Sequence, residues 1–135
     1  MTSTDRPVEL LNDALVVFIY VDDIERASRF YGGALGLDLV LEQAHCRIYK
    51  VSAGGFVGVC AAGDRPTTPD GIVVTLVRDD VDEYCARLIA QGIELEQPPA
   101  ANERFAIYNA FVRDPDGHLV EIQRFDDRAW SEPID

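Results

Sequence analysis

Few side chains in this sequence are suited to chemistry, and they do not form a familiar catalytic motif. The chain holds two histidines, His45 and His118, and three cysteines, Cys46, Cys60 and Cys85. The cysteines are separated by 14 and 25 residues and form no Cys-x-x-Cys pair. We therefore expect neither a disulfide framework nor a cysteine zinc site. Cys46 and Cys85 are expected to pack as small apolar groups.

Glu121 is the carboxylate for which the sequence leaves the most roles open. It lies in a run, residues 118–125, that alternates like a strand, so Leu119 and Gln123 would share its face. Three roles remain open: a metal ligand, a carboxylate that contacts a polar or cationic ligand, or a structural residue that accepts hydrogen bonds from Arg, Tyr or backbone donors. If the protein is an enzyme, Glu121 is the candidate general base.

A second group of polar and aromatic side chains lies on two further predicted strands. His45 begins a strand in which Arg47 and Tyr49 follow at alternating positions, so the three share a face. This trio either meets a ligand at the mouth of a cleft or faces solvent. Tyr108 is a candidate aromatic wall of the cleft. His118 follows a turn and is expected to be a partly exposed turn residue.

The elements that must position these residues follow a pattern that occurs twice. In each half an apolar strand precedes Asp-Asp-aliphatic, a helix and a Gly-aliphatic-acid-Leu segment, at residues 15–39 and again at 72–95. The further strand-like pieces are residues 37–41, 45–51, 56–61, 93–95, 105–112 and 118–125, and residues 97–103 read as a loop. Each half therefore reads β-α-β-β-β.

The predicted fold class is α+β, with two tandem βαβββ modules that form a curved mixed sheet around a cleft. Residues 1–135 are expected to form a single domain. Its parts are module 1 at about 12–62, a linker at 63–70, module 2 at about 71–126 and a C-terminal tail at 127–135.

Each predicted helix has start and stop signals. An Asp pair precedes each one, at residues 22–23 and 79–80, and either member of a pair can accept hydrogen bonds from the free N–H groups of the first turn. Gly36 and Gly92 can end the helices in a left-handed conformation. The second helix carries an apolar stripe made of Val81, Tyr84, Cys85, Leu88 and Ile89.

Strand alternation assigns side chains to faces. If Val16 points into the cleft, Phe18 and Tyr20 do so too, while Val17, Ile19 and Val21 face the helix. By the same rule Val73, Thr75 and Val77 face the cleft in the second half. Phe18 and Tyr20 are then either ligand contacts or ordinary core or dimer-interface residues. A cleft lined in this way suits an organic ligand.

Charge excludes some classes of partner. The chain carries 24 acidic side chains against 12 Lys and Arg, a net charge of −12, which is unfavourable for binding nucleic acid or an anionic membrane surface. Such a field attracts a cationic small molecule. The longest apolar run, Ala14–Val21, is far shorter than the roughly 20 residues of a membrane helix. No secretory signal is visible, so we expect a reduced, cytoplasmic protein.

Two segments resemble motifs of the vicinal oxygen chelate superfamily, which includes glyoxalase I, extradiol dioxygenases and bleomycin resistance proteins. Phe30-Tyr31-Gly32-Gly33-Ala34-Leu35-Gly36-Leu37 resembles the signature that ends its first helix. Asp114-Pro115-Asp116-Gly117-His118-Leu119-Val120-Glu121 resembles a second element, with His118 where Asn is usual. The resemblance covers roughly residues 12 to 126 and implies paired βαβββ modules with a cleft.

The resemblance also implies where metal ligands would lie: on the first and last strands of each module. The first-strand positions here are Val16 and Val73, and the last strand of the first half, residues 56–60, holds no carboxylate or imidazole. Only Glu121 matches a ligand position, and one carboxylate does not hold a catalytic divalent ion. No metal or cofactor is therefore expected.

The sequence is thus most similar to metal-free members of the bleomycin-resistance type, which bind a drug without altering it, usually as homodimers. The expected function is binding of a small organic ligand, aromatic or cationic, through Phe18, Tyr20, His45, Arg47, Tyr49, Tyr108, Glu121 and Gln123. One alternative is an enzyme, either a lyase, isomerase or dioxygenase with a displaced metal site or one that uses Glu121 as base. Another is a subunit whose cleft is vestigial.

Overall fold

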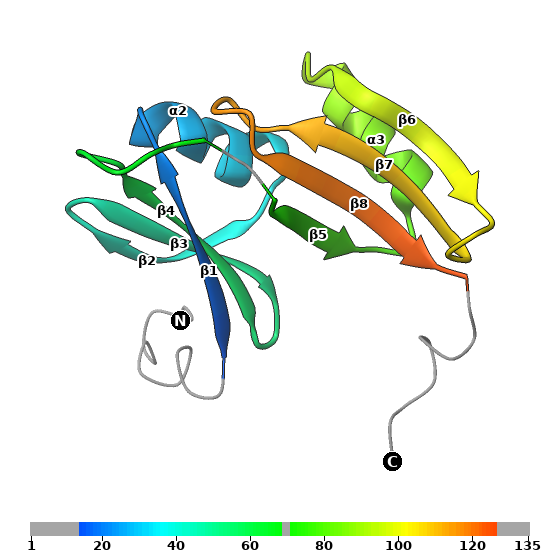
Figure 1. Cartoon of the computed structure of the whole chain (residues 1–135), viewed down its shortest axis with the longest axis horizontal. Coiled ribbons are helices and arrows are strands. Elements are labelled where there is room, and N and C mark those ends of the chain that lie inside the picture. Colours follow the sequence, from blue (N-terminus) through cyan, green and yellow to red (C-terminus); the bar gives the residue numbers. More distant parts are fainter. Residues whose placement is uncertain (1–13, 69–70, 127–135) are drawn as a thin grey trace. The chain divides into compact units, whose positions relative to one another are not determined.

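Each half of the chain builds one four-stranded mixed sheet with helix packed on one face (Figure 1). The computed structural model describes residues 14–68 and 71–126. The chain divides between Thr68 and Pro69 into two compact units.

The first unit contains a helical segment between the first and second of its four strands. Its elements are β1 (Leu15–Val21), α2 (Ile24–Ser28), the π-helical turn η2 (Arg29–Ala34), β2 (Asp38–Gln43), β3 (Cys46–Ser52) and β4 (Gly55–Ala61). The strand order is β1-β4-β3-β2. Strand β1 runs parallel to β4, and the other neighbours are antiparallel.

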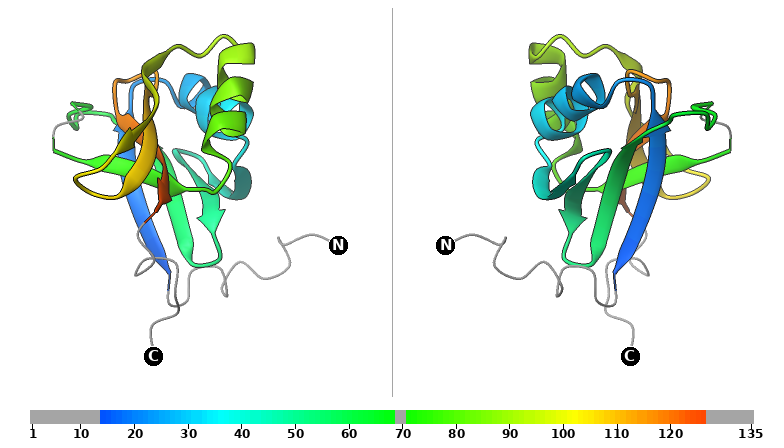
Figure 2. Two further views of the ribbon diagram at one scale, coloured as in Figure 1. Left: turned by 90° about the vertical axis from the view of Figure 1, so that its right-hand side faces the viewer. Right: turned by 90° about the vertical axis from the view of Figure 1, so that its left-hand side faces the viewer.

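The second unit repeats this topology. Its elements are β5 (Val73–Val77), α3 (Val81–Ala90), β6 (Leu95–Asn102), β7 (Ile107–Arg113) and β8 (Leu119–Phe125). The strand order is β5-β8-β7-β6, with β5 parallel to β8. Helix α3 packs on β6, β7 and β8 and covers one face of this sheet (Figure 2). The predicted α+β class and the pair of βαβββ modules are confirmed.

Alternation separates a helix-covered face from an opposite face in each sheet, as predicted. Ile19 and Val21 are buried, whereas Phe18, which precedes Ile19, is 49% exposed. In the second sheet Leu76 is buried while Val77 is 61% exposed. The set that contains Ile19, Val21 and Leu76 packs on the helix side, and the alternate set forms what we call the open face of each sheet.

The first helix starts at its predicted cap. Asp23 is the N-cap, and its carboxylate accepts hydrogen bonds from the backbone N–H groups of Glu25 (3.0 Å) and Arg26 (3.1 Å). These bonds satisfy two donors that have no partner within the helix. Gly36 follows the π-helical turn with a φ of +74°, the left-handed conformation expected at that position.

The second helix begins differently from the prediction. Asp80 occupies the N-cap position of α3, but its side chain makes no cap hydrogen bond. Its carboxylate instead accepts from the Arg78 guanidinium at 2.7 and 2.9 Å and from Arg87 at 3.4 Å. The hydrogen bonds from Arg78 lower the pKa of Asp80 to about 2.

The Asp80 carboxylate predicts a small acid-sensitive contribution to stability. Because its pKa is lower in the folded chain than in the unfolded chain, the contribution is present above pH 4 and is lost as the pH falls towards about 2. The wild-type protein should therefore lose stability over this range slightly more steeply than Asp80→Asn. Urea denaturation at a series of pH values measures the difference. Asp64 is exposed, so Asp64→Asn serves as the control. If Asp64→Asn reduced the pH dependence of stability as much as Asp80→Asn does, the effect would not come from Asp80.

The apolar stripe of α3 is confirmed except at its last position. Val81, Tyr84, Cys85 and Leu88 are buried. Ile89 is 58% exposed, because it lies at the margin of the stripe where the helix ends at Ala90. Cys85 is a buried free thiol, as predicted for a small apolar group, and burial raises its pKa.

The predicted loop at residues 97–103 is wrong, because most of it belongs to strand β6. Pro98 and Pro99 lie where the register between β6 and β7 shifts, between Gln97 and Ala100. Strand β6 is the outermost strand of its sheet, so the N–H groups that proline lacks are not needed there. The proline pair therefore interrupts the ladder without ending the strand.

The expectation of reduced, unpaired cysteines is also wrong, because a disulfide joins Cys46 to Cys60. The two residues lie directly opposite each other on the antiparallel strands β3 and β4. This pairing depends on strand register, which cysteine spacing does not reveal. It removes the argument for a cytoplasmic location that rested on reduced cysteines.

None of the helices in residues 14–68 and 71–126 has the length and apolar character needed to cross a membrane. The predicted C-terminal tail, residues 127–135, lies outside the described residues, as do residues 69 and 70 of the predicted linker.

Candidate functional site

A cavity of about 680 Å³ lies on the open face of the second sheet, opposite helix α3. This volume is within the range of small-molecule sites. Its walls come from β6, the β6–β7 turn, β7 and β8, all within the second unit. The lining residues include Gln97, Phe105, Ile107, Asn109, Phe111 and Glu121.

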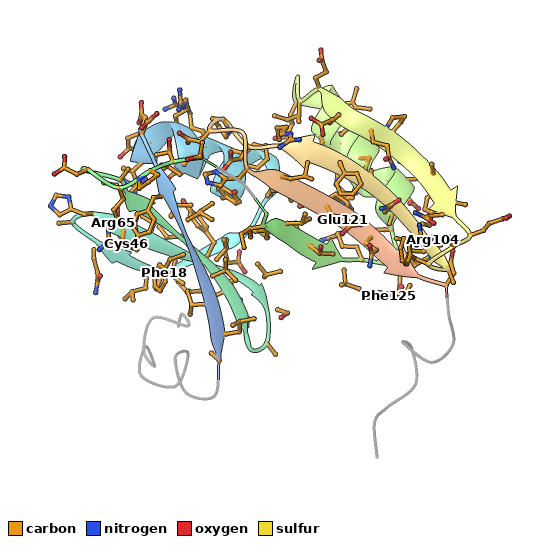
Figure 3. All side chains as sticks on the ribbon, in the orientation of Figure 1. Phe18, Cys46, Arg65, Arg104, Glu121 and Phe125 are labelled. Atoms are coloured by element: carbon orange, nitrogen blue, oxygen red, sulfur yellow. A yellow bond between two sulfur atoms is a disulfide. The ribbon has the colours of Figure 1, made fainter. Side chains whose placement is uncertain are left out.

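Glu121 is surrounded by neutral hydrogen-bond donors. The Thr75 hydroxyl donates to Oε1 at 2.8 Å, and the Asn109 amide donates to Oε2 at 2.7 Å. The amide of Gln123, with its NH₂ group turned to the carboxylate, donates to both oxygens. Three uncharged side chains thus hold the carboxylate in one orientation, close to the middle of β8 (Figure 3).

Strand register explains why these residues meet. Thr75 on β5 and Phe111 on β7 lie directly beside Glu121 on β8, one on each side. Asn109 lies beside Gln123 in the same way. Because residues in register point to the same face of a sheet, these five side chains share the open face.

The polar row continues from β7 to β6. The Gln97 amide lies 3.5 Å from both the side-chain and the main-chain oxygen of Asn109, which are long, weak hydrogen bonds. Asn109 is itself buried. Gln97 therefore donates to Asn109, and Asn109 donates to the carboxylate of Glu121.

The carboxylate of Glu121 has no cationic partner among the described residues, where each ion pair joins other groups. Within the part of the chain that the structure describes, the residues that line the cavity include a second carboxylate, Glu103, and no Lys, Arg or His. Arg104 packs over the ring of Phe105 at 5.1 Å and is not a lining residue. The cavity is therefore negatively charged.

On the first sheet, Phe18 and Tyr20 share the open face, as predicted. The ring of Phe18 lies over Gly58, its register partner on β4, where any Cβ atom would come within 2.5 Å of the ring. Gly58 thus leaves room for the ring against the sheet (Figure 3). The Tyr20 ring has the Arg65 guanidinium 5.0 Å from its centre.

Arg47 and Tyr49 lie on the helix-covered face, whereas the sequence suggested that they lie at the mouth of a cleft or face solvent. The Arg47 guanidinium donates to Ser28 at 2.7 Å and pairs with Glu25, on the helix α2. Tyr49 is buried and stacks with Tyr31. The odd positions of β3 point towards the helix, and both side chains are engaged in the packing of the first unit.

His45 and Tyr108 are also placed away from the cavity. His45 is exposed in the turn between β2 and β3. Tyr108 lies on the helix-covered face of the second sheet, where its hydroxyl donates to Asp82 of α3 at 2.6 Å. Tyr108 therefore does not form the predicted aromatic wall. Phe111, three residues later and on the opposite face, lines the cavity instead.

A match to a family model identifies the superfamily of the chain. The model of the Glyoxalase/Bleomycin resistance protein/Dioxygenase superfamily matches residues 13–122. The chain belongs to this superfamily.

Several solved structures share the fold. TioX from Micromonospora sp. ML1 is 28% identical, with a TM-score of 0.66 over 82% of this chain and 94% of that one. A glyoxalase-related enzyme from Fulvimarina pelagi is 24% identical, with a TM-score of 0.68 over 84% and 88% of the two chains. Lactoylglutathione lyase from Agrobacterium tumefaciens is 21% identical, with a TM-score of 0.72 over 90% and 98%. No curated protein matches the sequence significantly.

The two superfamily motifs have structural roles in this chain. Phe30 and Tyr31 are buried, with their rings edge to face at 5.0 Å. Asp114 accepts hydrogen bonds from the backbone N–H groups of Asp116 (2.9 Å) and His118 (2.8 Å) and so shapes the turn before β8. His118 was expected to be a partly exposed turn residue, but it is buried against Asp114.

The metal-ligand positions of the superfamily do not fit a metal ion in this chain. The first-strand positions hold the aliphatic side chains of Val16 and Val73, and Cys60 of β4 is bonded to Cys46. Glu121 is the remaining candidate, and its oxygens accept hydrogen bonds from neutral donors. Across residues 14–68 and 71–126, no three His, Cys, Asp or Glu side chains gather closely enough to hold an ion.

Sequence reasoning named Glu121 of the cavity lining, and Gln123 beside it, but missed the rest of the lining. The missed residues are Gln97, Ala100, Ala101, Asn102, Glu103, Phe105, Ile107, Asn109 and Phe111. Alternation along β7 separates Asn109 and Phe111 from Tyr108 and Ala110, but both sets mix apolar and polar side chains, so the pattern alone does not say which set faces the helix. The small size of Ala110 was the available signal, because small side chains suit a helix-covered face.

Proposed function

We propose that this protein binds a small organic ligand without a metal ion, as a member of its superfamily that does not alter the ligand. The observation that carries the proposal is the cavity itself. It is lined by aromatic and amide side chains around the oriented carboxylate of Glu121, and the other positions that would hold a metal lack ligands. Glu121 is the proposed ligand contact within it, with Gln123 beside it on the open face. Phe18 and Tyr20 remain proposed contacts on the open face of the first sheet, and the proposed assembly is a homodimer.

Metal content and metal-independent binding test this function together. Elemental mass spectrometry of protein purified without chelators should find no stoichiometric metal. A screen of small aromatic compounds by thermal unfolding should then find a stabilising ligand, and the shift should be the same in EDTA. At a concentration of 100 times its Kd, a ligand adds about 2.7 kcal/mol to the free energy of unfolding.

A pair of variants places the ligand in the cavity. Phe111→Ala removes a cavity wall and should abolish the shift, whereas Val77→Ala removes an exposed side chain from the same sheet outside the cavity and should not. Near-stoichiometric bound metal, or loss of the shift in EDTA, would overturn the proposal.

The alternative of an enzyme with Glu121 as general base has less support. A general base needs a carboxylate lone pair directed at the substrate proton. The hydrogen bonds from Thr75, Asn109 and Gln123 already use part of the acceptor capacity of Glu121 and orient the carboxylate towards these neighbours.

A further inference from the structure

We propose that the cavity of the second unit selects an organic cation that carries N–H donors, such as a primary ammonium, amidinium or guanidinium group, attached to an aromatic or apolar body. This inference rests on the proposed function and names the class of ligand.

The first step is the uncompensated charge of Glu121. The side chain is half-buried, and its described neighbours Thr75, Asn109 and Gln123 donate hydrogen bonds without supplying positive charge. Charges removed from water are normally paired, because desolvation of a lone carboxylate is costly. The part of the lining that residues 14–68 and 71–126 supply holds no cation, so a bound ligand is suited to supply one.

The second step is the direction of the hydrogen bonds around the carboxylate. The amide NH₂ groups of Gln97 and Asn109 are turned towards Asn109 and Glu121 respectively. The carbonyl oxygens of these two amides are acceptors and, with the carboxylate, are what this part of the cavity offers a ligand. A surface of acceptors selects a group that donates several hydrogen bonds.

The third step is the apolar wall beside the charge. Phe111 lies directly beside Glu121 in the β7–β8 register, and Phe105 and Ile107 also line the cavity. A cation held by the carboxylate would thus lie next to an aromatic ring, which adds a favourable electrostatic contact. The cavity has room for an apolar body against the same side chains. The net charge of −12 attracts such a ligand from a distance.

A series of matched probes tests the class of ligand on the unaltered full chain. Benzylammonium has a positive charge and N–H donors, benzyl alcohol has a similar shape without charge, and benzyltrimethylammonium has the charge without N–H groups. Isothermal titration calorimetry should rank benzylammonium at least tenfold tighter than benzyl alcohol, a difference of about 1.4 kcal/mol. Benzyltrimethylammonium should bind more weakly than benzylammonium, because it cannot donate to the oxygens.

A variant pair separates direct contact from long-range attraction. Glu121→Gln keeps the shape of the side chain and should weaken benzylammonium binding about tenfold while leaving benzyl alcohol unchanged. Glu83→Gln removes the same charge from the exposed face of α3 and should leave both affinities unchanged. Thermal unfolding checks that both variants fold, and the probe series on the wild-type protein tests the proposal without any variant.

The outcomes distinguish this inference from the proposed function. Equal affinity for benzylammonium and benzyl alcohol, or for benzylammonium and benzyltrimethylammonium, would overturn the selection for an N–H cation and leave metal-independent binding standing. An equal loss in Glu83→Gln and Glu121→Gln would also overturn it, because the effect would then be a general field. Stoichiometric metal in the purified protein would instead overturn the proposed function.

Discussion

Tyr31→Ala is expected to lower the free energy of unfolding of the first unit by about 3 to 5 kcal/mol, the range for large aromatic side chains removed from a core. Tyr31 is fully buried in the π-helical turn. Its ring meets Phe30 edge to face and stacks with Tyr49 at 6.5 Å, so the substitution removes two ring contacts as well as volume. Urea denaturation followed by circular dichroism measures the loss.

Two further variants identify the cause of this loss. Tyr31→Phe keeps both ring contacts and should retain most of the stability. Leu15→Ala removes a side chain of the same unit that is 67% exposed, and it should cost at most about 0.5 kcal/mol. A loss in Leu15→Ala as large as that in Tyr31→Ala would show that burial does not decide the effect.

Reduction of the disulfide between Cys46 and Cys60 is expected to lower the free energy of unfolding by about 3 kcal/mol. The bond closes a short loop, with a sequence separation of 14 residues, and a loop of this length restricts the unfolded chain by about that amount. Urea denaturation with and without a reductant measures the change. Thiol titration of the same samples reports whether the bond has been opened.

The double variant Cys46→Ser/Cys60→Ser is the matched control. It should have the stability of the reduced wild-type protein and should not respond to reductant, because the remaining Cys85 is a free thiol. If the wild-type protein keeps its stability after thiol titration shows reduction, the disulfide contributes nothing measurable. A response of the double variant to reductant would show that the effect has another source.

The fold could be predicted from the sequence because local signals agreed with one another. Alternation along β1 identified Ile19 and Val21 as the buried face, and Asp23 capped the helix that follows. The prediction of a loop at residues 97–103 failed because it relied on the proline pair alone. Pro98 and Pro99 indicated a loop, yet the outermost strand of a sheet tolerates them.

The site could be predicted only in part, because register between strands decides which side chains meet. The family resemblance led to Glu121, but its partners Thr75 and Asn109 come from strands separated from it by 46 and 12 residues. The same limit hid the disulfide, since Cys46 and Cys60 meet only through the pairing of β3 with β4. Arg47 and Tyr49 were correctly placed on one face, and only packing against the helix shows which face that is.

The proline pair of β6 also bears on aggregation. The outer side of a sheet presents unpaired backbone groups that can template the growth of β-structure between molecules. Strand β6 is such an edge, and it also forms a wall of the cavity. Pro98 and Pro99 supply no N–H groups, so a strand from another molecule finds an interrupted ladder. Pro98 and Pro99, which made this strand look like a loop in the sequence, thus protect the wall of the cavity against edge-to-edge association.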